Sequence, residues 1–412
     1  MIARSLIPFF EACRRAGGRA LVVGGTVRDA LLWTPGKDVD IEVHALSLDD
    51  VLRVLRPFGS VSEVGRSFGV LKLRHGSGEV DVSLPRRDRR EGTGHKGIRA
   101  TADPFLGPEE AARRRDLTIN AIAWDPLEDV FVDPFHGRTD LAHRTLRAVD
   151  RHTFGEDPLR ALRVAQFAAR FDFAVAPELR ALCAEMPLTE LPAERIRGEV
   201  EKLLLKGRNL AHGWTFAWET GMWEKVLPEW TAPPPDLDRV ARVAVQDPDR
   251  RLALLYAAAC DDLSVDGCTA VLDRLRVHRV GRTHVRRVVL SLLRRRDAAR
   301  GPLDETRVRR LGEEGDLDLL AALVGSERLL ELAERLGVAE GPLPVLLDGE
   351  TLRILGVRPG PEMGRVMAAL RERQLVGDIV DADGARHEVT RMLETGGTPD
   401  RKSTRLNSSH LV

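Results

Sequence analysis

The sequence predicts an α+β protein whose N-terminal third mixes strands with helices and whose remainder is helical. Up to about residue 135, short apolar runs with strand character alternate with helical stretches and Gly/Pro turns. Beyond residue 155, apolar residues recur at spacings of three and four, with many arginines between them. Prolines such as Pro187, Pro192 and Pro228 divide this second part into separate helical bundles.

Composition indicates a soluble globular chain of several domains. Of its 412 residues, 43% are hydrophobic and 31% charged, and 63 Lys and Arg residues balance 63 Asp and Glu residues. Because the net charge is zero, any affinity for nucleic acid must come from a local basic face. The four cysteines lack metal-ligand spacing, and no apolar run approaches the roughly 20 residues of a membrane span. We therefore expect a cytoplasmic protein with reduced thiols and no membrane contact.

The N-terminal part is expected to contain strands at residues 20–23, 39–43, 70–73, 80–84 and 119–124. The first of these strands leads into Gly24 and Gly25, which permit a sharp turn where backbone N–H groups can approach a phosphate. Residues 27–32 then form a short helix whose positive N-terminal end faces the same place.

The second expected strand carries alternating carboxylates. A period of two puts Asp38, Asp40 and Glu42 on one face and three apolar residues on the other. Neighbouring carboxylates repel each other unless a cation lies between them, and Mg²⁺ commonly takes one or two carboxylates together with substrate phosphates. Combined with the Gly-Gly turn, this pattern predicts a site for metal-assisted nucleotidyl transfer. The alternative is the solvated acidic face of a surface hairpin.

Three adjacent arginines, Arg113 to Arg115, run into the last expected strand. Guanidinium groups bind phosphates bidentately, so the cluster could hold a triphosphate, with Asp116 and Asn120 as partners for ribose or phosphate. Taken alone, the cluster is better explained as a basic helix end that complements the helix dipole.

A third cluster begins at Asp157 and Pro158, a pair typical of a helix N-cap and first helical residue. Arg160 and Arg163 follow one turn apart. Because Asp accepts and Arg donates hydrogen bonds, these side chains could instead read the edge of a nucleobase. Residues 191–204 form an amphipathic helix with ion pairs, which by itself is structural.

In order and spacing, these clusters resemble the bacterial-type (class II) tRNA nucleotidyltransferase and poly(A) polymerase family. The likeness covers residues 20–205 and returns at residues 347–364. It implies a DNA-polymerase-β-like nucleotidyltransferase head with a mixed sheet, followed by all-α neck, body and tail domains. The expected ranges are 1–145 for the head, 146–206 for the neck, 207–335 for the body, 336–398 for the tail and 399–412 for a polar, non-native end.

The resemblance also implies roles for the motif residues. Asp38 and Asp40 would hold the Mg²⁺ ions, with Asp81 as a candidate third carboxylate. The triphosphate and ribose would be bound by Gly24, Gly25, Arg28, Arg114, Arg115, Asp116 and Asn120. Nucleotide choice would come from a protein template made of Glu156, Asp157 and Arg160, with Arg163 beside it.

The activity so implied is addition of CMP, CMP and AMP from CTP and ATP to the 3′ end of tRNA. The partners would be the 3′ end, acceptor stem and elbow of tRNA. A poly(A) polymerase shares every head and neck motif, and CC-adding or A-adding specialists stay open. The chain has no long basic C-terminal extension, which favours tRNA. A catalytically inactive RNA-binding scaffold would require loss of Asp38 and Asp40, and both are present.

Two positions depart from the family pattern. Gln166 stands before Phe167 where an arginine is frequent, and Trp33 stands where a glycine commonly follows Leu-Leu. The sequence indicates no oligomeric state.

Overall fold

The computed structural model describes residues 4–34, 36, 39–65, 69–76, 78–90, 98–230, 234, 236–277 and 285–394. Asp38 and the expected non-native end therefore lie outside the described residues. The chain forms two compact units. The first contains Met1–Ala241 and Gly267–His278, and the second contains Arg242–Asp266 and Arg279–Val412.

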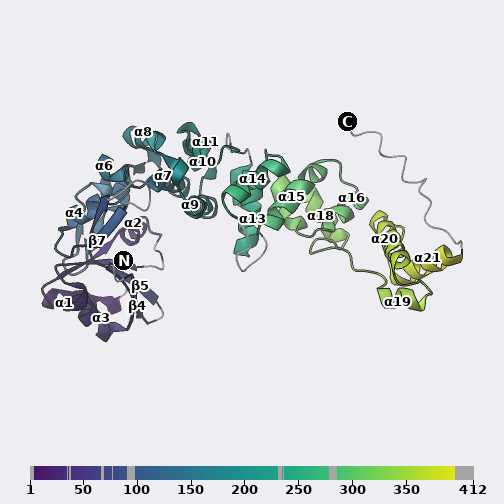
Figure 1. Ribbon diagram of the computed structural model, residues 1–412, viewed down its shortest axis with the longest axis horizontal. Coiled ribbons are helices and arrows are strands. Elements are labelled where there is room, and N and C mark those ends of the chain that lie inside the picture. Colours follow the sequence, from purple (N-terminus) through teal and green to yellow (C-terminus); the bar gives the residue numbers. More distant parts are fainter. Residues whose placement is uncertain are drawn as a thin grey trace. The chain divides into compact units, whose positions relative to one another are not determined.

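A seven-stranded sheet forms the centre of the N-terminal part of the first unit (Figure 1). Its strand order is β3-β4-β5-β2-β1-β8-β9. The pair β2–β5 is parallel and the pairs β1–β2, β1–β8, β3–β4, β4–β5 and β8–β9 are antiparallel, so the expected mixed sheet is confirmed. The bounds are β1 (Arg19–Val23), β2 (Val39–His44), β3 (Ser60–Gly65), β4 (Val70–His75), β5 (Gly78–Ser83), β8 (Ala123–Asp125) and β9 (Val130–Val132).

The helices that accompany this sheet are short. They are α1 (Ile7–Arg15), α2 (Gly25–Leu31), α3 (Leu48–Leu55), α4 (Pro108–Arg113) and α5 (Gly137–Ala142), with 3₁₀ turns at Arg4–Leu6 and Arg56–Phe58. A separate hairpin pairs β6 (Arg86–Arg90) with β7 (Ile98–Ala102). Helix α3 begins where the Ser47 hydroxyl accepts a hydrogen bond from the Asp50 N–H, as expected of an N-cap.

The strand expected at residues 119–124 is wrong in its first half. Thr118–Asn120 forms a 3₁₀ helix, and the strand β8 starts only at Ala123. The cause is local hydrogen bonding, because Asp116 Oδ1 accepts from both the Leu117 N–H and Asn120 Nδ2, at 2.8 and 2.9 Å. Such side-chain bonds to nearby backbone favour a turn over a sheet. The other four expected strands are confirmed.

The rest of the first unit is mainly helical, as expected. Its central helix, α7 (Leu159–Phe171), packs against α9 (Ala193–Lys206) and α10 (Leu210–Glu219). The contact with α10 requires Gly213, since a Cβ there would lie 2.4 Å from the Ala165 carbonyl oxygen. The smaller elements are β10 (Thr145–Leu146), α6 (Arg151–Phe154), β11 (Ala174–Val175), α8 (Pro177–Glu185), a 3₁₀ turn (Leu188–Glu190), α11 (Met222–Val226) and α12 (Leu237–Ala241).

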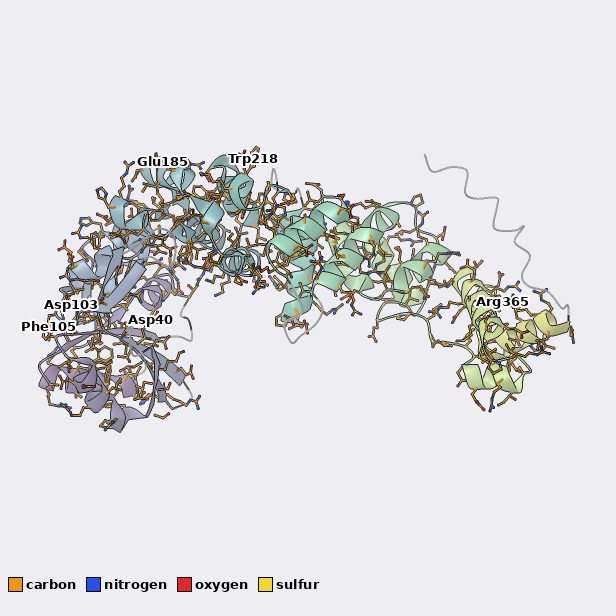
Figure 2. The ribbon with its side chains drawn as sticks, viewed as in Figure 1. Asp40, Asp103, Phe105, Glu185, Trp218 and Arg365 are labelled. Atoms are coloured by element: carbon orange, nitrogen blue, oxygen red, sulfur yellow. The ribbon has the colours of Figure 1, made fainter. Side chains whose placement is uncertain are left out.

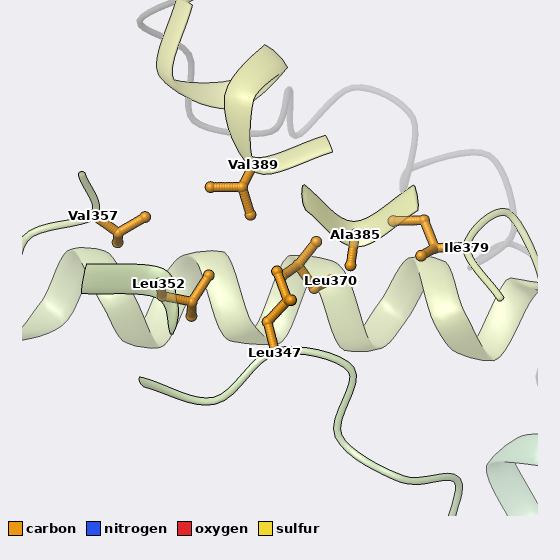
Figure 3. Packing of buried hydrophobic residues seen from close by; sticks show 7 residues of the cluster. All are labelled: Leu347, Leu352, Val357, Leu370, Ile379, Ala385 and Val389. Carbon is orange, nitrogen blue, oxygen red and sulfur yellow. The ribbon is translucent and has the colours of Figure 1, made fainter. Parts of the chain in front are cut away.

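The second unit is helical throughout its described part. Its helices are α13 (Pro248–Ala259), α15 (Val285–Arg300), α16 (Glu305–Gly312), α17 (Leu317–Val324), α18 (Glu327–Arg335), α19 (Gly349–Ile354), α20 (Pro361–Val376) and α21 (Ala382–Glu394); α14 (Val265–Arg274) spans the division between the units. Around α19, α20 and α21 a small separate core is formed by Leu347, Leu352, Val357, Leu370, Ile379, Ala385 and Val389 (Figure 3). None of the described helices is long and apolar enough to cross a membrane.

The arginine-rich helix α15 uses several of its guanidinium groups internally. Arg295 donates to the carbonyl oxygens of Leu311 and Gly315, at 2.6 and 2.7 Å, and Arg296 donates to that of Leu263 at 2.7 Å. These bonds satisfy backbone acceptors in the last turn of α16 and in the connections that follow α16 and α13. The arginines of α15 are therefore in part packing residues, and its basic face is smaller than the sequence suggests.

Candidate active site

A cavity of about 520 Å³ lies in the first unit, between α2, the segment after α4, α7 and α9. Its walls contain nine of the residues that the sequence singled out: Gly25, Arg28, Arg114, Arg115, Asp116, Asn120, Asp157, Arg160 and Arg163. The walls also contain residues that the sequence analysis did not assign to the site: Leu159, Gln166, Phe167, Arg170, Arg195, Lys202 and Lys206. Four other described residues that the sequence assigned to the site, Gly24, Asp40, Asp81 and Glu156, are not among the lining residues.

The charge of this cavity is strongly positive. Nine of its lining side chains are Arg or Lys, and two are Asp. Guanidinium and ammonium groups gathered in one concave site raise the local potential and favour a polyanion such as a triphosphate.

The Gly24–Gly25 turn lies next to the strand that carries Asp40. Gly24 has φ 66°, and a Cβ there would lie 2.6 Å from Nη1 of Arg115, so a side chain would meet both strain and a clash. In the next residue, the Thr26 hydroxyl accepts a hydrogen bond of 3.0 Å from the Asp40 N–H. The start of α2 is thereby joined to the strand that carries Asp40.

Arg28 is a wall residue with little exposed surface. Its side chain donates to Asp29 at 2.8 Å and also to Asn120 Oδ1, and its guanidinium carbon lies 4.8 Å from the ring centre of Phe171. Burial lowers the pKa of Arg28, and the neighbouring Asp29 opposes that shift. The structure therefore places Arg28 in the cavity wall with most of its hydrogen bonds committed to the protein.

Asp116 also lines the cavity and accepts hydrogen bonds from two other lining side chains. Its Oδ2 accepts from Nε of Arg163 at 2.8 Å, and its Oδ1 accepts from Asn120. Burial would raise the pKa of this carboxyl, but the positive charge of Arg163 and the hydrogen bonds from Asn120 and the Leu117 N–H lower it overall. Arg163 is further held at 3.8 Å from Glu199 on α9. These contacts join the segment after α4 to α7 and α9.

Glu42 forms ion pairs with Arg114 and Arg115. Its Oε2 lies 3.4 Å from Nη2 of Arg114 and 3.8 Å from Nη2 of Arg115, and its Oε1 lies 3.3 Å from Nε2 of His44. Burial raises the pKa of Glu42, but the His44 hydrogen bond and the charges of Arg115 and Arg114 together lower it to about 2. The sequence placed Glu42 on the face of Asp40 without giving it this role.

Replacing Glu42 with glutamine is expected to weaken the pH dependence of stability. The folded pKa, about 2, lies below the ordinary value of 4.5, so the carboxylate stabilises the fold above pH 4.5 and loses that effect as the pH falls toward 2. The full effect is up to about 3 kcal/mol. Urea unfolding from pH 6 to 2 should show a lower stability at pH 6 and a shallower slope in Glu42→Gln. An unchanged slope would assign the acid sensitivity to other groups.

Asp157 and Arg160 are both engaged in protein contacts. Asp157 Oδ1 accepts from the Leu159 N–H at 3.1 Å, and its Oδ2 accepts from Arg195 at 2.8 Å. The two terminal nitrogens of Arg160 donate to the carbonyl oxygens of Thr153 and Arg114, at 2.5 and 2.6 Å. The helix starts one residue later than predicted, with Pro158 as the N-cap, but the Asp157 side chain still accepts from the first N–H of the helix. The template role stays a prediction.

The carboxylates proposed for metal binding lie on two neighbouring strands. Asp40 on β2 and Asp81 on β5 are partners in the parallel register, so their side chains share one face of the sheet. Asp40, labelled in Figure 2, is half-buried. The carboxylate of Asp81 lies 3.3 Å from Nζ of Lys72. Asp38 would precede Asp40 but lies outside the described residues, among which no group of three or more metal-binding side chains occurs. Two hard-oxygen ligands on one face fit a divalent cation that also binds phosphates.

The basic residues of α9 were missed because the helix predicted at residues 191–204 was interpreted as structural, with ion pairs, and Lys206 lies beyond it. Arg195, Lys202 and Lys206 are separated by seven and four positions, which places them on one helix face. Glu199 lies on that face too and accepts from Lys202 at 2.8 Å. The spacing of the three cations was the signal that could have assigned them to the cavity.

Gln166 is the second missed feature of the wall. It is 2% exposed, and its Nε2 has no hydrogen-bond partner among the described residues. The other amide of the wall, Asn120, is bonded to Arg28 and Asp116. Gln166 is thus a neutral donor available inside a cationic cavity.

Comparisons with known proteins agree with this architecture. Residues 20–147 match the family model of the poly A polymerase head domain, and residues 172–232 match that of a probable RNA and SrmB-binding site of polymerase A. The CCA-adding enzyme of Blochmanniella pennsylvanica is 42% identical over 189 residues, which is 45% of this chain and 44% of that protein. The multifunctional CCA protein of Mannheimia succiniciproducens is 42% identical over 190 residues, 44% of this chain and 43% of that protein. The chain thus matches less than half the length of these relatives.

The fold of the chain is also found in solved structures. The Bacillus stearothermophilus CCA-adding enzyme in complex with CTP aligns with a TM-score of 0.68 over 96% of this chain and 100% of that one, at 23% identity. The Thermotoga maritima CCA-adding enzyme complexed with tRNA aligns with a TM-score of 0.66 over 93% and 94%, at 21% identity. Residues 20–147, which contain the Gly-Gly turn and the strand of Asp40, are thus similar to the head domain of poly A polymerases, and residues 172–232 are similar to their RNA-binding region.

Proposed function

We propose that this protein is a tRNA nucleotidyltransferase that adds CMP, CMP and AMP to the 3′ end of tRNA from CTP and ATP. The observation that carries the proposal is the cavity in which nine cationic side chains surround two aspartates, joined through Thr26 to the strand of Asp40. A site that holds a nucleoside triphosphate beside metal-binding carboxylates suits nucleotidyl transfer. The named activity of the curated relatives supports CCA addition as the form of this chemistry.

In the proposed mechanism, three different groups of residues bind the triphosphate, the metal ion and the base. Arg114 and Arg115, held by Glu42, would bind the triphosphate and neutralise its charge. Asp40, with Asp38 and Asp81, would hold Mg²⁺, which when bound supplies Lewis-acid activation of the attacking hydroxyl and of the phosphate. The side of the cavity formed by Asp157 and Arg160 would meet the base.

The domain division is part of the same proposal. We assign residues 1–145 to the catalytic head, 146–206 to the neck that completes the cavity, 207–335 to a body and 336–398 to a tail that contacts tRNA. The enzyme would act in the cytoplasm on the acceptor stem, elbow and 3′ end of tRNA.

The test is nucleotide addition by the purified full chain. Three tRNA substrates, lacking one, two or three terminal nucleotides, are each incubated with Mg²⁺ and labelled CTP or ATP. We expect CMP addition to the two shorter substrates and AMP addition only to tRNA ending in CC. Addition of long AMP tracts to any RNA would identify a poly(A) polymerase, and loss of one of the two nucleotides would identify a CC-adding or A-adding enzyme. No addition to any substrate would contradict the proposal.

Binding of tRNA is expected to weaken steeply with salt. With a net charge of zero, the chain must attract RNA through local basic residues, and each phosphate contact releases counterions. Titrations of labelled tRNA at several KCl concentrations should give a straight line of negative slope for the logarithm of affinity against that of salt. An affinity equal at 50 and 200 mM KCl would argue that basic residues do not bind the RNA.

A further inference from the structure

Trp33 combines two features that are unusual in a folded protein. Its side chain is 92% exposed, and its backbone has φ 55°, the left-handed region that favours glycine. Among the described non-glycine residues with positive φ, it has the largest side chain. Strained backbone of this kind concentrates at functional sites.

The backbone at Trp33 is held firmly. Its N–H donates to the Ala30 carbonyl at 3.1 Å, and the next N–H, that of Thr34, donates to the Asp29 carbonyl at 2.8 Å. Asp29 is itself bonded to Arg28 and Arg170, two residues of the cavity wall. The indole is therefore displayed on a turn that is tied to the nucleotide cavity.

The position of Trp33 links it to the reaction site. Helix α2 starts at the Gly-Gly turn, where Thr26 bonds Asp40, and Trp33 follows its other end, about 10 Å away at 1.5 Å per residue. If the terminal hydroxyl of an RNA strand lies at Asp40, the last few nucleotides of that strand are long enough to reach Trp33. Unpaired bases in single-stranded RNA stack on aromatic side chains of the proteins that bind them.

We propose that Trp33 is a stacking platform for an unpaired base close to the 3′ end of the RNA substrate. The inference rests on the proposed function, since it takes the RNA end as the group that covers the indole. Base–aromatic stacking is tolerant of sequence because every base has a π face. A glycine at this position would relax the backbone but would offer no face, so the strained tryptophan fits a recognition role better than a structural one.

The test compares Trp33→Gly, Trp33→Ala and Trp33→Phe in the full chain. The matched control is Trp218→Ala, which removes another exposed indole, 47% exposed, from α10. With tRNA lacking CCA, we expect the KM for tRNA to rise about tenfold in the Gly and Ala variants, while the KM for CTP and the kcat stay unchanged. Trp33→Phe and Trp218→Ala should stay close to wild type. Thermal unfolding should show Trp33→Gly at least as stable as wild type, because the strain is relieved.

A binding measurement separates this inference from the proposed function. RNA hairpins with a blunt end and with an unpaired 3′ overhang are titrated against wild type and Trp33→Ala, without nucleotide. We expect wild type to prefer the overhang and the variant to lose that preference, even if no nucleotide addition is observed. An overhang preference retained in Trp33→Ala would overturn the inference. So would an equal loss of affinity for both hairpins, or a change confined to self-association of the protein.

Discussion

Replacing Asp40 with alanine is expected to lower the rate of nucleotide addition by about a thousandfold or more. Metal positioning and charge neutralisation supply much of the barrier reduction in this type of transfer, and a missing carboxylate removes both. Asp38→Ala is expected to act in the same way. The fold and the affinity for tRNA should change little, because Asp40 is half-buried at the beginning of β2 and its backbone N–H still bonds Thr26. Single-turnover rates with labelled CTP, beside tRNA binding and melting temperature, measure these quantities.

The strand next to β2 offers a matched pair of variants for this experiment. Asp81 and Glu79 both lie near Lys72, at 3.3 and 3.6 Å, but only Asp81 is in register with Asp40. Asp81→Asn should therefore slow the reaction markedly and shift the Mg²⁺ requirement to higher concentration, whereas Glu79→Gln should do neither. Turnover of Asp40→Ala within tenfold of wild type would refute the metal-site assignment. Equal behaviour of the Asp81 and Glu79 variants would remove Asp81 from it.

The sequence predicted the parts of the site that depend on short-range pattern. The Gly-Gly turn, the strand of Asp40 and the helix after Pro158 each follow from residues that are neighbours in the chain. The period-two alternation also placed Glu42 on the same face as Asp40, and in the structure Glu42 pairs there with Arg114 and Arg115. Local rules sufficed for these elements because backbone geometry fixes them.

The remaining parts depend on contacts between distant segments. The bond from Arg160 to the Arg114 carbonyl spans 46 positions, and that from Arg195 to Asp157 spans 38. No pattern within one helix says which of its charges will face another helix, so the helix that carries Arg195 was interpreted as structural. The strand predicted at residues 119–124 was wrong in its first half for a related reason. Asp116 accepts hydrogen bonds from the Leu117 N–H and from the Asn120 side chain, and these bonds favour a turn over a strand.

Replacing Asp157 with alanine and with asparagine is expected to separate two roles of that side chain. In the structure, Asp157 caps α7 through the Leu159 N–H and also accepts from Arg195. Asparagine is as good an N-cap as aspartate, whereas alanine removes the cap and lowers stability by about 1 kcal/mol. If Asp157 only caps the helix, Asp157→Asn should behave as wild type.

The template role predicts a different result for the asparagine variant. An amide presents a donor where the carboxylate presents an acceptor, and a base edge read by hydrogen bonds is rejected strongly when one partner is left unpaired. Asp157→Asn should therefore lose the preference for CTP and ATP over UTP and GTP by about tenfold or more, with little change in melting temperature. The incorporation rates of the four nucleotides, measured on the same preparation as the melting temperature, decide between the roles.

Arg195→Ala is the control that completes this comparison. It removes the partner of Asp157 Oδ2 but leaves the cap at Leu159 and the carboxylate itself. Because an unpaired carboxylate still accepts hydrogen bonds, its nucleotide preference should be shifted less than that of Asp157→Asn. Arg160 must leave the carbonyl oxygens of Thr153 and Arg114 to reach a base, so Arg160→Ala should affect both stability and selection. Wild-type selectivity in Asp157→Asn would limit this residue to its structural contacts with the Leu159 N–H and Arg195.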